Sequence, residues 1–138
     1  EKIPPPPPPP PLKGGGRITV AYVSSHFTAT SIGRESLFII GAHDTHRVHA
    51  VCFALNEEGG LSALKLAFRS AVKGVCHEFQ DVSGLGDEDI ASAINTAQPD
   101  VLLDLNGWAG GQRERVIAMK PARVQVNYKN WVASTGMR

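Results

Sequence analysis

The sequence predicts an α/β domain built around a mainly parallel sheet. Two observations carry this prediction. From residue 17 onward, short apolar, β-branched runs alternate with longer segments of helical periodicity, which is the pattern of successive βαβ units. Apolar residues make up 42% of the 138 residues, which is enough to bury a core in one domain.

The first half of the chain supplies two strands and two helices. Residues 17–23 (RITVAYV) are β-branched and apolar and stop at two serines, and residues 48–54 (VHAVCFA) form a second run of this kind. Between them, residues 32–42 predict a helix, for which Ser31 is a possible N-cap. Residues 61–72 predict the second helix, because apolar residues recur on one helical face: Leu61, Leu64, Ala67, Phe68 and Ala71.

The second half continues the alternation with three strands and two helices. Residues 75–79 are a weaker third strand, and residues 87–96 a helix with acids in its first turn, where the helix dipole favours them. Residues 100–105 (DVLLDL), 112–119 and 123–128 (RVQVNY) follow as a strand, a short helix and a fifth strand. Because crossovers between parallel strands are right-handed, we expect a doubly wound, mainly parallel Rossmann-like sheet with helices on both faces.

Ligands of such sheets bind beyond the carboxyl ends of the strands. Three loops should therefore line a cleft: residues 24–31, 106–111 and 127–136. The second of these, NGWAGG, follows a strand and precedes a helix, so its glycines would let the backbone approach an anionic ligand closely. A tight strand-to-helix turn explains the same spacing equally well.

Few side chains suggest acid–base or metal chemistry. His26 is the histidine in a predicted ligand loop, although a surface histidine is the simpler account. His43, His46 and His49 are three residues apart, but they cross from a helix end into a strand, so no metal site is expected. Asp104 alternates with apolar neighbours on its strand and could be a solvent-side or cleft carboxylate.

The sequence divides into an N-terminal arm and a folded part. Residues 1–16 hold eight consecutive prolines, Pro4 to Pro11, followed by three glycines, and we expect a disordered polyproline and glycine linker there. The same prolines could also bind an SH3- or WW-type partner. Residues 17–138 should form the domain.

Composition limits the partners and the compartment. Lysine and arginine number 14 against 13 acids, which predicts no general affinity for nucleic acid or for an anionic membrane. The sequence has no apolar stretch near the ~20 residues of a membrane span and no secretory signal peptide. Cys52 and Cys76 lie in apolar runs and are expected to be reduced and buried. We therefore expect a cytoplasmic or nuclear protein.

Four short motifs in order resemble one known family. They are residues 22–27 (YVSSHF), 51–55 (VCFAL), 99–107 (PDVLLDLNG) and 119–128 (MKPARVQVNY). Their order and intervals resemble landmarks of the catalytic regions of O-GlcNAc transferase and Spindly-type protein O-glycosyltransferases. The resemblance covers residues 17–138.

The resemblance implies a fold and an activity. The fold would be the first Rossmann-like half of a GT-B enzyme, which in this family usually follows tetratricopeptide repeats. The activity would be transfer of a sugar, GlcNAc from UDP-GlcNAc in preference to fucose from GDP-fucose, to Ser or Thr of acceptor proteins, with no metal or other cofactor. The matching loops place substrate-binding residues at strand ends, namely Ser24, Ser25, Asn106, Gly107, Asn127 and Tyr128.

The chain also departs from the family pattern. Thr30 stands where the family has a histidine at the catalytic cleft, so no catalytic residue is matched, and His26 would replace it only if the loop were re-routed. Residues 129–136 replace a glycine-rich turn. Because the chain ends at Arg138, we expect an incomplete enzyme that does not turn over alone. The alternative is a non-catalytic interaction module with a degenerate transferase fold.

Overall fold

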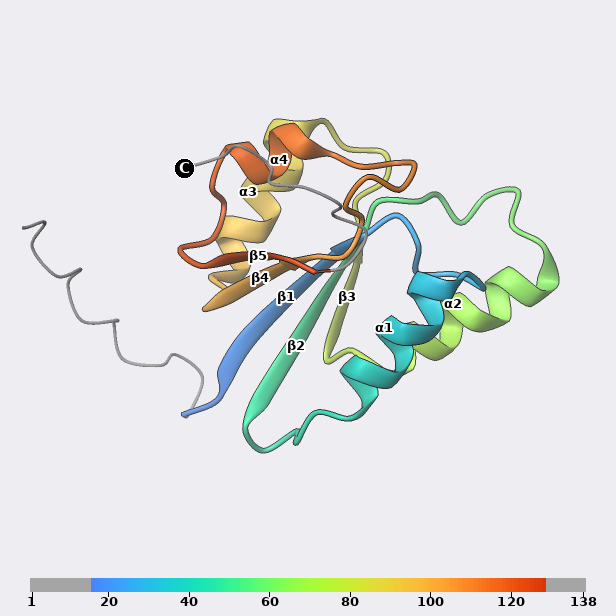
Figure 1. The fold of residues 1–138 in the computed structure, drawn as a ribbon, viewed down its shortest axis with the longest axis horizontal. Helices are drawn as coiled ribbons and strands as arrows, with labels where there is room; N and C mark the ends of the chain where they lie inside the picture. Colours follow the sequence, from blue (N-terminus) through green and yellow to red (C-terminus); the bar gives the residue numbers. More distant parts are fainter. Residues whose placement is uncertain (1–15, 129–138) are drawn as a thin grey trace, which may run out of the picture.

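The computed structural model describes residues 16–128, which form one five-stranded sheet flanked by four helices (Figure 1). The polyproline arm and the end of the third predicted loop lie outside the described residues. The strands are β1 (Ile18–Ser24), β2 (Val48–Ala54), β3 (Glu78–Asp81), β4 (Val101–Asp104) and β5 (Gln125–Asn127). The helices are α1 (Ser31–Gly41), α2 (Ala63–Val75), α3 (Asp87–Ala97) and α4 (Glu114–Ala118).

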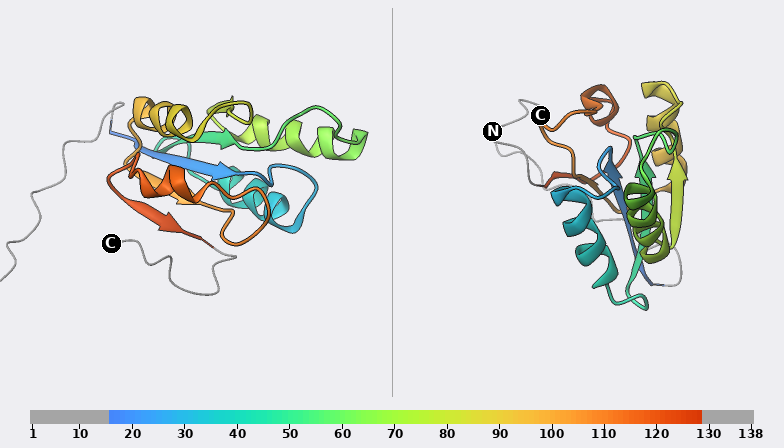
Figure 2. Two further views of the ribbon diagram at one scale, coloured as in Figure 1. Left: turned by 90° about the horizontal axis from the view of Figure 1, so that it is seen from above. Right: turned by 90° about the vertical axis from the view of Figure 1, so that its right-hand side faces the viewer.

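All four pairs of neighbouring strands are parallel, in the order β3-β2-β1-β4-β5. The chain moves outward from β1 to β3, then crosses back to β4 on the other side of β1. Helices α1 and α2 cover one face of the sheet, and α3 and α4 cover the other (Figure 2). The prediction of a doubly wound Rossmann-like sheet is confirmed.

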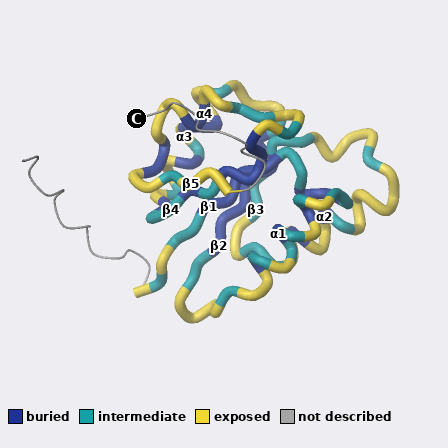
Figure 3. Tube along the Cα trace, in the orientation of Figure 1, coloured by how far each residue is buried: buried dark blue, intermediate teal, exposed yellow. Residues whose placement is uncertain are grey.

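The core has one apolar layer on each face of the sheet, and the buried residues concentrate in the central strands (Figure 3). One layer joins α3 and α4 to alternate strand residues such as Val23, Phe53 and Leu102. The other joins α1 and α2 to the intervening residues, such as Tyr22 and Cys52. Side chains alternate between faces along a strand, so strands that are buried on both faces read as continuous apolar runs.

Local signals place the helix starts, with one correction. Thr30, not Ser31, is the N-cap of α1: its Oγ1 accepts a hydrogen bond from the backbone N of Gly33 at 3.0 Å. Ser62 caps α2 in the same way, at 3.5 Å from Lys65 N. The predicted acids do occupy the first turn of α3, where the positive end of the helix dipole stabilises their negative charge.

The apolar face predicted for the second helix is only partly the face that packs on the sheet, because Phe68 packs partly against the core and most of the other predicted residues do not. Arg69 and Val72 are the buried residues of α2, whereas Leu64 is 70% exposed and Ala67 and Ala71 are also exposed. The buried face is offset from the predicted one toward Arg69, which pairs with a carboxylate at the end of β3. The third strand also begins later than predicted, at Glu78, since α2 continues to Val75.

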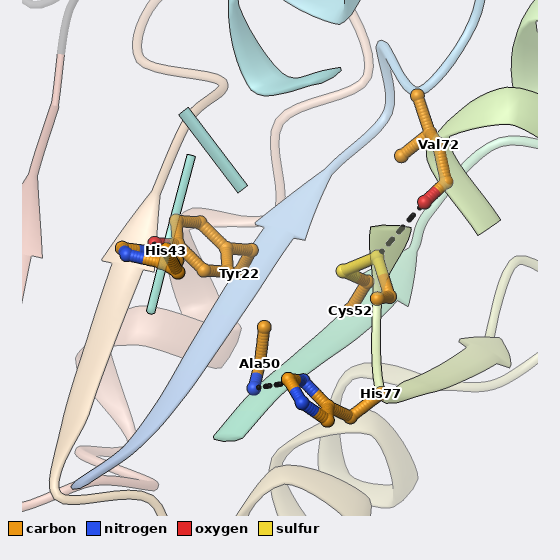
Figure 4. The surroundings of a disulfide bond; sticks show 7 residues. Tyr22, His43, Ala50, Cys52, Val72 and His77 are labelled. Carbon is orange, nitrogen blue, oxygen red and sulfur yellow. Dashed lines mark hydrogen bonds between the residues drawn. A yellow bond between two sulfur atoms is a disulfide. The ribbon is translucent and has the colours of Figure 1, made fainter. Parts of the chain in front are cut away.

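The expectation of reduced cysteines is wrong. Cys52 of β2 and Cys76, which directly follows α2, form a disulfide with their Cα atoms 6.2 Å apart (Figure 4). The two residues lie in separate apolar runs, as expected, but the crossover brings them together over 24 residues of chain. Within residues 16–128, no helix is long and apolar enough to cross a membrane.

Candidate functional site at the β1–β4 switch point

The candidate site lies where the two halves of the sheet diverge, at the carboxyl ends of β1 and β4. The connections from these neighbouring strands leave toward opposite faces, which opens a crevice in doubly wound sheets. Ser24 is the last residue of β1 and Ser25 follows it, and Asn106 lies two residues after the end of β4. Three of the predicted substrate-binding residues therefore meet here, although 81 residues separate Ser25 from Asn106.

Asn106 connects the two loops. Its Oδ1 accepts hydrogen bonds from Ser25 N at 2.7 Å and from Ser24 Oγ at 3.2 Å. Its Nδ2 donates to Ser25 Oγ at 2.8 Å, and its backbone N donates to a carboxylate oxygen of Asp104 at 2.9 Å. Asn106 is 1% exposed, so these bonds replace the water that its amide loses on burial.

The glycine-rich loop after β4, residues 106–111, contacts the loop at the end of β1 that carries Ser24 and Ser25, which we call the serine loop. Ser25 Oγ donates to the carbonyl of Gly110 at 2.8 Å. Gly111 has φ +84°, and a Cβ there would lie 2.7 Å from Ser25 Oγ, so no other residue fits without movement. These contacts fit a strand-to-helix turn, which also explains the spacing of the glycines, and binding of a ligand by this segment stays a prediction.

His26 is better held than a free surface histidine. Its backbone N donates to Ser24 Oγ at 2.9 Å, and its Nε2 lies 3.1 Å from the carbonyl oxygen of Gly110. A carbonyl only accepts, so Nε2 carries a proton in this contact and Nδ1 of a neutral ring keeps its lone pair. The ring is half-buried, directly beside the switch point.

Thr30 has a structural role that uses its hydroxyl twice. Besides capping α1, its Oγ1 donates to the carbonyl of His26 at 3.2 Å. Gly33 lets this loop pack against α1, because a Cβ at Gly33 would lie 2.0 Å from the Thr28 carbonyl oxygen and 2.5 Å from that of His26. Gly33 is not among the residues predicted from the sequence, although a glycine in the first turn of a helix, where it has no helical advantage, is a signal for such a contact.

The other predicted site residues lie at the same edge but in different settings. Gly107 is buried in the turn behind Asn106. Asn127 pairs in register with Asp104, and Tyr128 N donates to the Asp104 carbonyl at 2.9 Å; both residues are exposed. Tyr128 also lines a small hollow beside α1 with Ile32, Glu35, Ser36, Ile39 and Leu105.

Asp104 points away from its apolar neighbours as expected, but it is 6% exposed and so not on the solvent side.

The remaining histidines lie at the opposite, amino edge of the sheet. His43 Nε2 is hydrogen-bonded to the hydroxyl of Tyr22, and burial raises the pKa of Tyr22 to about 12. His49 Nε2 pairs with Glu78 Oε1 at 2.9 Å, so these two histidines have separate partners. The described part of the chain contains no group of three or more His, Cys, Asp or Glu side chains placed to hold a metal ion.

Comparison with known proteins assigns the chain to a family. The family described as Glycosyl transferase family 41 matches residues 9–138. This chain belongs to that family. The resemblance to O-GlcNAc transferase and Spindly-type catalytic regions is therefore confirmed.

Relatives within family 41 come from plants and animals. The chain is 30% identical over 123 residues to the Arabidopsis thaliana protein named probable UDP-N-acetylglucosamine--peptide N-acetylglucosaminyltransferase SEC, covering 89% of this chain and 12% of that protein. It is 29% identical over 126 residues to the Caenorhabditis elegans UDP-N-acetylglucosamine--peptide N-acetylglucosaminyltransferase, covering 91% and 10%. The chain thus spans about an eighth or less of the length of these relatives.

A solved structure supports the fold. A mutant of the Thermobaculum terrenum O-GlcNAc transferase superposes with a TM-score of 0.73 at 24% sequence identity, over 83% of this chain and 21% of that one. At this identity the likeness concerns the fold alone. Residues 16–128 therefore have the Rossmann-like architecture of one part of that enzyme, as the GT-B interpretation requires.

Proposed function

We propose that this chain is the acceptor-side half of a protein O-glycosyltransferase, which transfers GlcNAc from UDP-GlcNAc to Ser or Thr hydroxyls of proteins. The observation that carries the proposal is the family 41 match over residues 9–138. The printed names of the relatives support a UDP-GlcNAc donor and a peptide acceptor. GDP-fucose remains the second donor, and no metal or other cofactor is invoked.

Within the site, we propose that Ser24, Ser25, Asn106 and Gly107 shape the wall that faces the substrates. The hydrogen bonds through Asn106 support this role, since they hold the two loops in one arrangement before any ligand arrives. Asn127 and Tyr128 would extend the wall along β5. His26 is the candidate for proton transfer, because its Nδ1 could accept a proton from an acceptor hydroxyl.

An inactive interaction module is the second candidate, and one observation favours it. Thr30 stands at the family's histidine position and its hydroxyl is committed to capping α1 and to the His26 carbonyl. A threonine in that role exchanges no protons near neutral pH. In this case, the Pro4 to Pro11 arm would tether the domain to an SH3- or WW-type partner.

Calorimetric titration of the chain with UDP-GlcNAc and GDP-fucose tests whether the sugar-nucleotide donor is bound mainly by the second catalytic half. We expect no transfer and at most weak binding, because a cleft between two domains holds its ligand from both sides. Micromolar binding to either nucleotide would place the donor site in this half and contradict the proposal. In a version extended by a second catalytic half, Thr30→His should raise turnover if the enzyme interpretation holds and leave it at zero if the module interpretation does.

The compartment stays a prediction. A cytoplasmic or nuclear location was expected partly from reduced cysteines, and that argument fails now that Cys52 and Cys76 are bonded. Imaging of the tagged protein in cells would test the location directly.

A further inference from the structure

The disulfide joins the middle of the sheet to the end of a helix. Cys52 is fully buried in β2, which pairs with β1 on one side and with β3 on the other. Cys76 is only partly buried and is the residue through which α2 leads into β3. The bond therefore decides how firmly the last turn of α2 is attached to the sheet.

Apart from the disulfide, α2 is attached by the polar contacts of Arg69 with Asp81 and Asn56 and by a few apolar residues. Of its 13 residues, Arg69 and Val72 are buried, while Phe68 and Val75 pack only partly against the core. Helix α3, on the opposite face, buries Ile90, Ala91 and Ile94 in 11 residues without any covalent bond. Loss of the disulfide should therefore loosen α2 and leave α3 in place.

The surroundings also suit two free thiols. Cys76 Sγ lies 3.2 Å from the carbonyl oxygen of Val72, one helical turn earlier, so a thiol at Cys76 has an acceptor at hand (Figure 4). Cys52 is surrounded by apolar residues, where a reduced cysteine packs as a small hydrophobic side chain. The domain has an apolar layer on each face of its sheet and does not depend on the bond for its core, unlike a small disulfide scaffold.

We propose that Cys52 and Cys76 are a reversible redox pair, which fastens α2 to the sheet when oxidised and releases it when a small thiol of the glutathione class reduces the bond. A thiolate attacks the more accessible sulfur, that of Cys76, and Cys52 leaves as a thiolate and takes up a proton. A second thiolate then attacks the small-molecule sulfur of this mixed disulfide, and Cys76 leaves as a thiolate and takes up a proton. The products are two protein thiols and one small-molecule disulfide, so two electrons and two protons enter the protein.

This inference does not depend on glycosyl transfer. It concerns the β2–β3 side of the sheet, whereas the candidate site lies between β1 and β4. The released helix also carries Arg69, which binds the carbonyl of Asn56 in the loop after β2. The carboxyl edge next to the site would therefore gain mobility on reduction.

The test measures free thiols and local opening of the backbone in parallel samples. The chain is equilibrated in glutathione buffers of increasing reduced-to-oxidised ratio and alkylated, and its mass is measured by mass spectrometry. Parallel samples undergo hydrogen exchange. We expect a single transition from zero to two alkylated cysteines, with exchange in residues 63–75 at least ~10-fold faster in the reduced form. Residues 87–97 of α3 should not change.

Two variants complete the test. Cys76→Ser keeps a donor for the Val72 carbonyl, and Cys52→Ala removes the buried partner without adding a polar group. Both should show the α2 exchange of the reduced chain at every buffer ratio. Two outcomes would overturn the proposal: alkylation of both cysteines in fully oxidising buffer, or reduction that occurs only with equal loss of protection in α3, which would make the bond a permanent structural link.

Discussion

At the scale of single residues, close contacts decide how the site is assembled. Asn106 satisfies its buried amide by binding Ser24 and Ser25, and Gly33 removes a side chain where two carbonyl oxygens reach α1. Gly33 has no room for a side chain, and Asn106 is held by hydrogen bonds to both serines. Because they bring different segments of chain together, small changes at these positions should have large effects.

Gly33→Ala tests the contact between the serine loop and α1. The new Cβ would overlap the backbone oxygens of Thr28 and His26, which cannot rotate away, so we expect the free energy of unfolding to fall by about 2–3 kcal/mol. Gly74→Ala is the matched control, since a Cβ at this helical glycine meets nothing within 4 Å. It should raise stability by about 0.5–1 kcal/mol in urea unfolding. Equal effects of the two variants would contradict the contact.

His77 predicts how stability depends on pH. Burial, followed by the positive groups His49 and Arg17, lowers the pKa of His77 below its ordinary 6.5, although Glu78 acts in the opposite direction. Its Nδ1 accepts a hydrogen bond from the backbone N of Ala50 at 3.0 Å, which a protonated ring cannot do.

The unfolded chain therefore binds this proton before the folded chain does, as the pH falls. The contribution of His77 is complete above about pH 6.5 and is lost progressively as the pH falls from that value through the lower pKa of the folded chain. Thermal unfolding between pH 7.5 and 5.5 should show falling stability, and His77→Gln should flatten the slope. His46→Gln changes an exposed histidine and serves as the control; an unchanged slope in His77→Gln would refute the assignment.

At the scale of elements, the ion pair between a buried arginine and an exposed aspartate contributes to the orientation of α2. Arg69 is 3% exposed; its guanidinium donates to Asp81 Oδ2 at 2.6 Å and lies 5.1 Å from the centroid of the Phe79 ring. Burial acts to raise the pKa of Asp81, but hydrogen bonds from Ser83 and the charge of Arg69 hold it below its ordinary value. The helix therefore turns its charged residue inward and leaves Leu64 in solvent.

Asp81→Asn tests that pair. The variant leaves the buried guanidinium without its counter-charge, and we expect unfolding free energy to fall by about 1–2 kcal/mol, less than for a fully buried pair because Asp81 is 40% exposed. Glu57→Gln, in the exposed loop before α2, should change stability by less than about 0.5 kcal/mol. A neutral Asp81→Asn would show that apolar contacts alone orient α2.

At the scale of the whole molecule, the order of the strands concentrates functional candidates at one edge. The carboxyl ends of β1 and β4 carry the serine and glycine loops, whereas the amino edge carries the histidine contacts. Residues 24–26 and 106–110 are thus joined by hydrogen bonds into one unit at this edge. The family assignment adds a ligand class to a place that the topology already favours.

Amide chemical-shift mapping tests this location even if binding is weak. On addition of millimolar UDP-GlcNAc, shifts should concentrate in residues 24–26 and 106–110, because ligands enter at the switch point. Amides at the amino edge, such as those of Arg47 and His77, are the internal control and should not move. Shifts centred on that edge would place the ligand elsewhere and remove the proposed roles of Ser25 and Asn106.

The sequence by itself determined the architecture of this protein. Alternating apolar runs and helical segments specified five parallel strands, because side-chain periodicity is a local property and crossovers have one hand. The loop after β1 and the loop after β4 could also be assigned to one edge, since parallel strands end together. The family resemblance was likewise carried by short contiguous motifs.

Only the tertiary structure decided which of these residues touch. The bonds between Ser25 and Asn106 span 81 residues, and the disulfide spans 24, so neither appears in any local pattern. The same holds for the burial of Arg69 on α2, which depends on Asp81 of the next strand and is not visible in the apolar stripe of the helix. Local periodicity specifies the helices and strands. The strand order decides which side chains come within contact distance of each other, and it therefore decides which contacts form at the site.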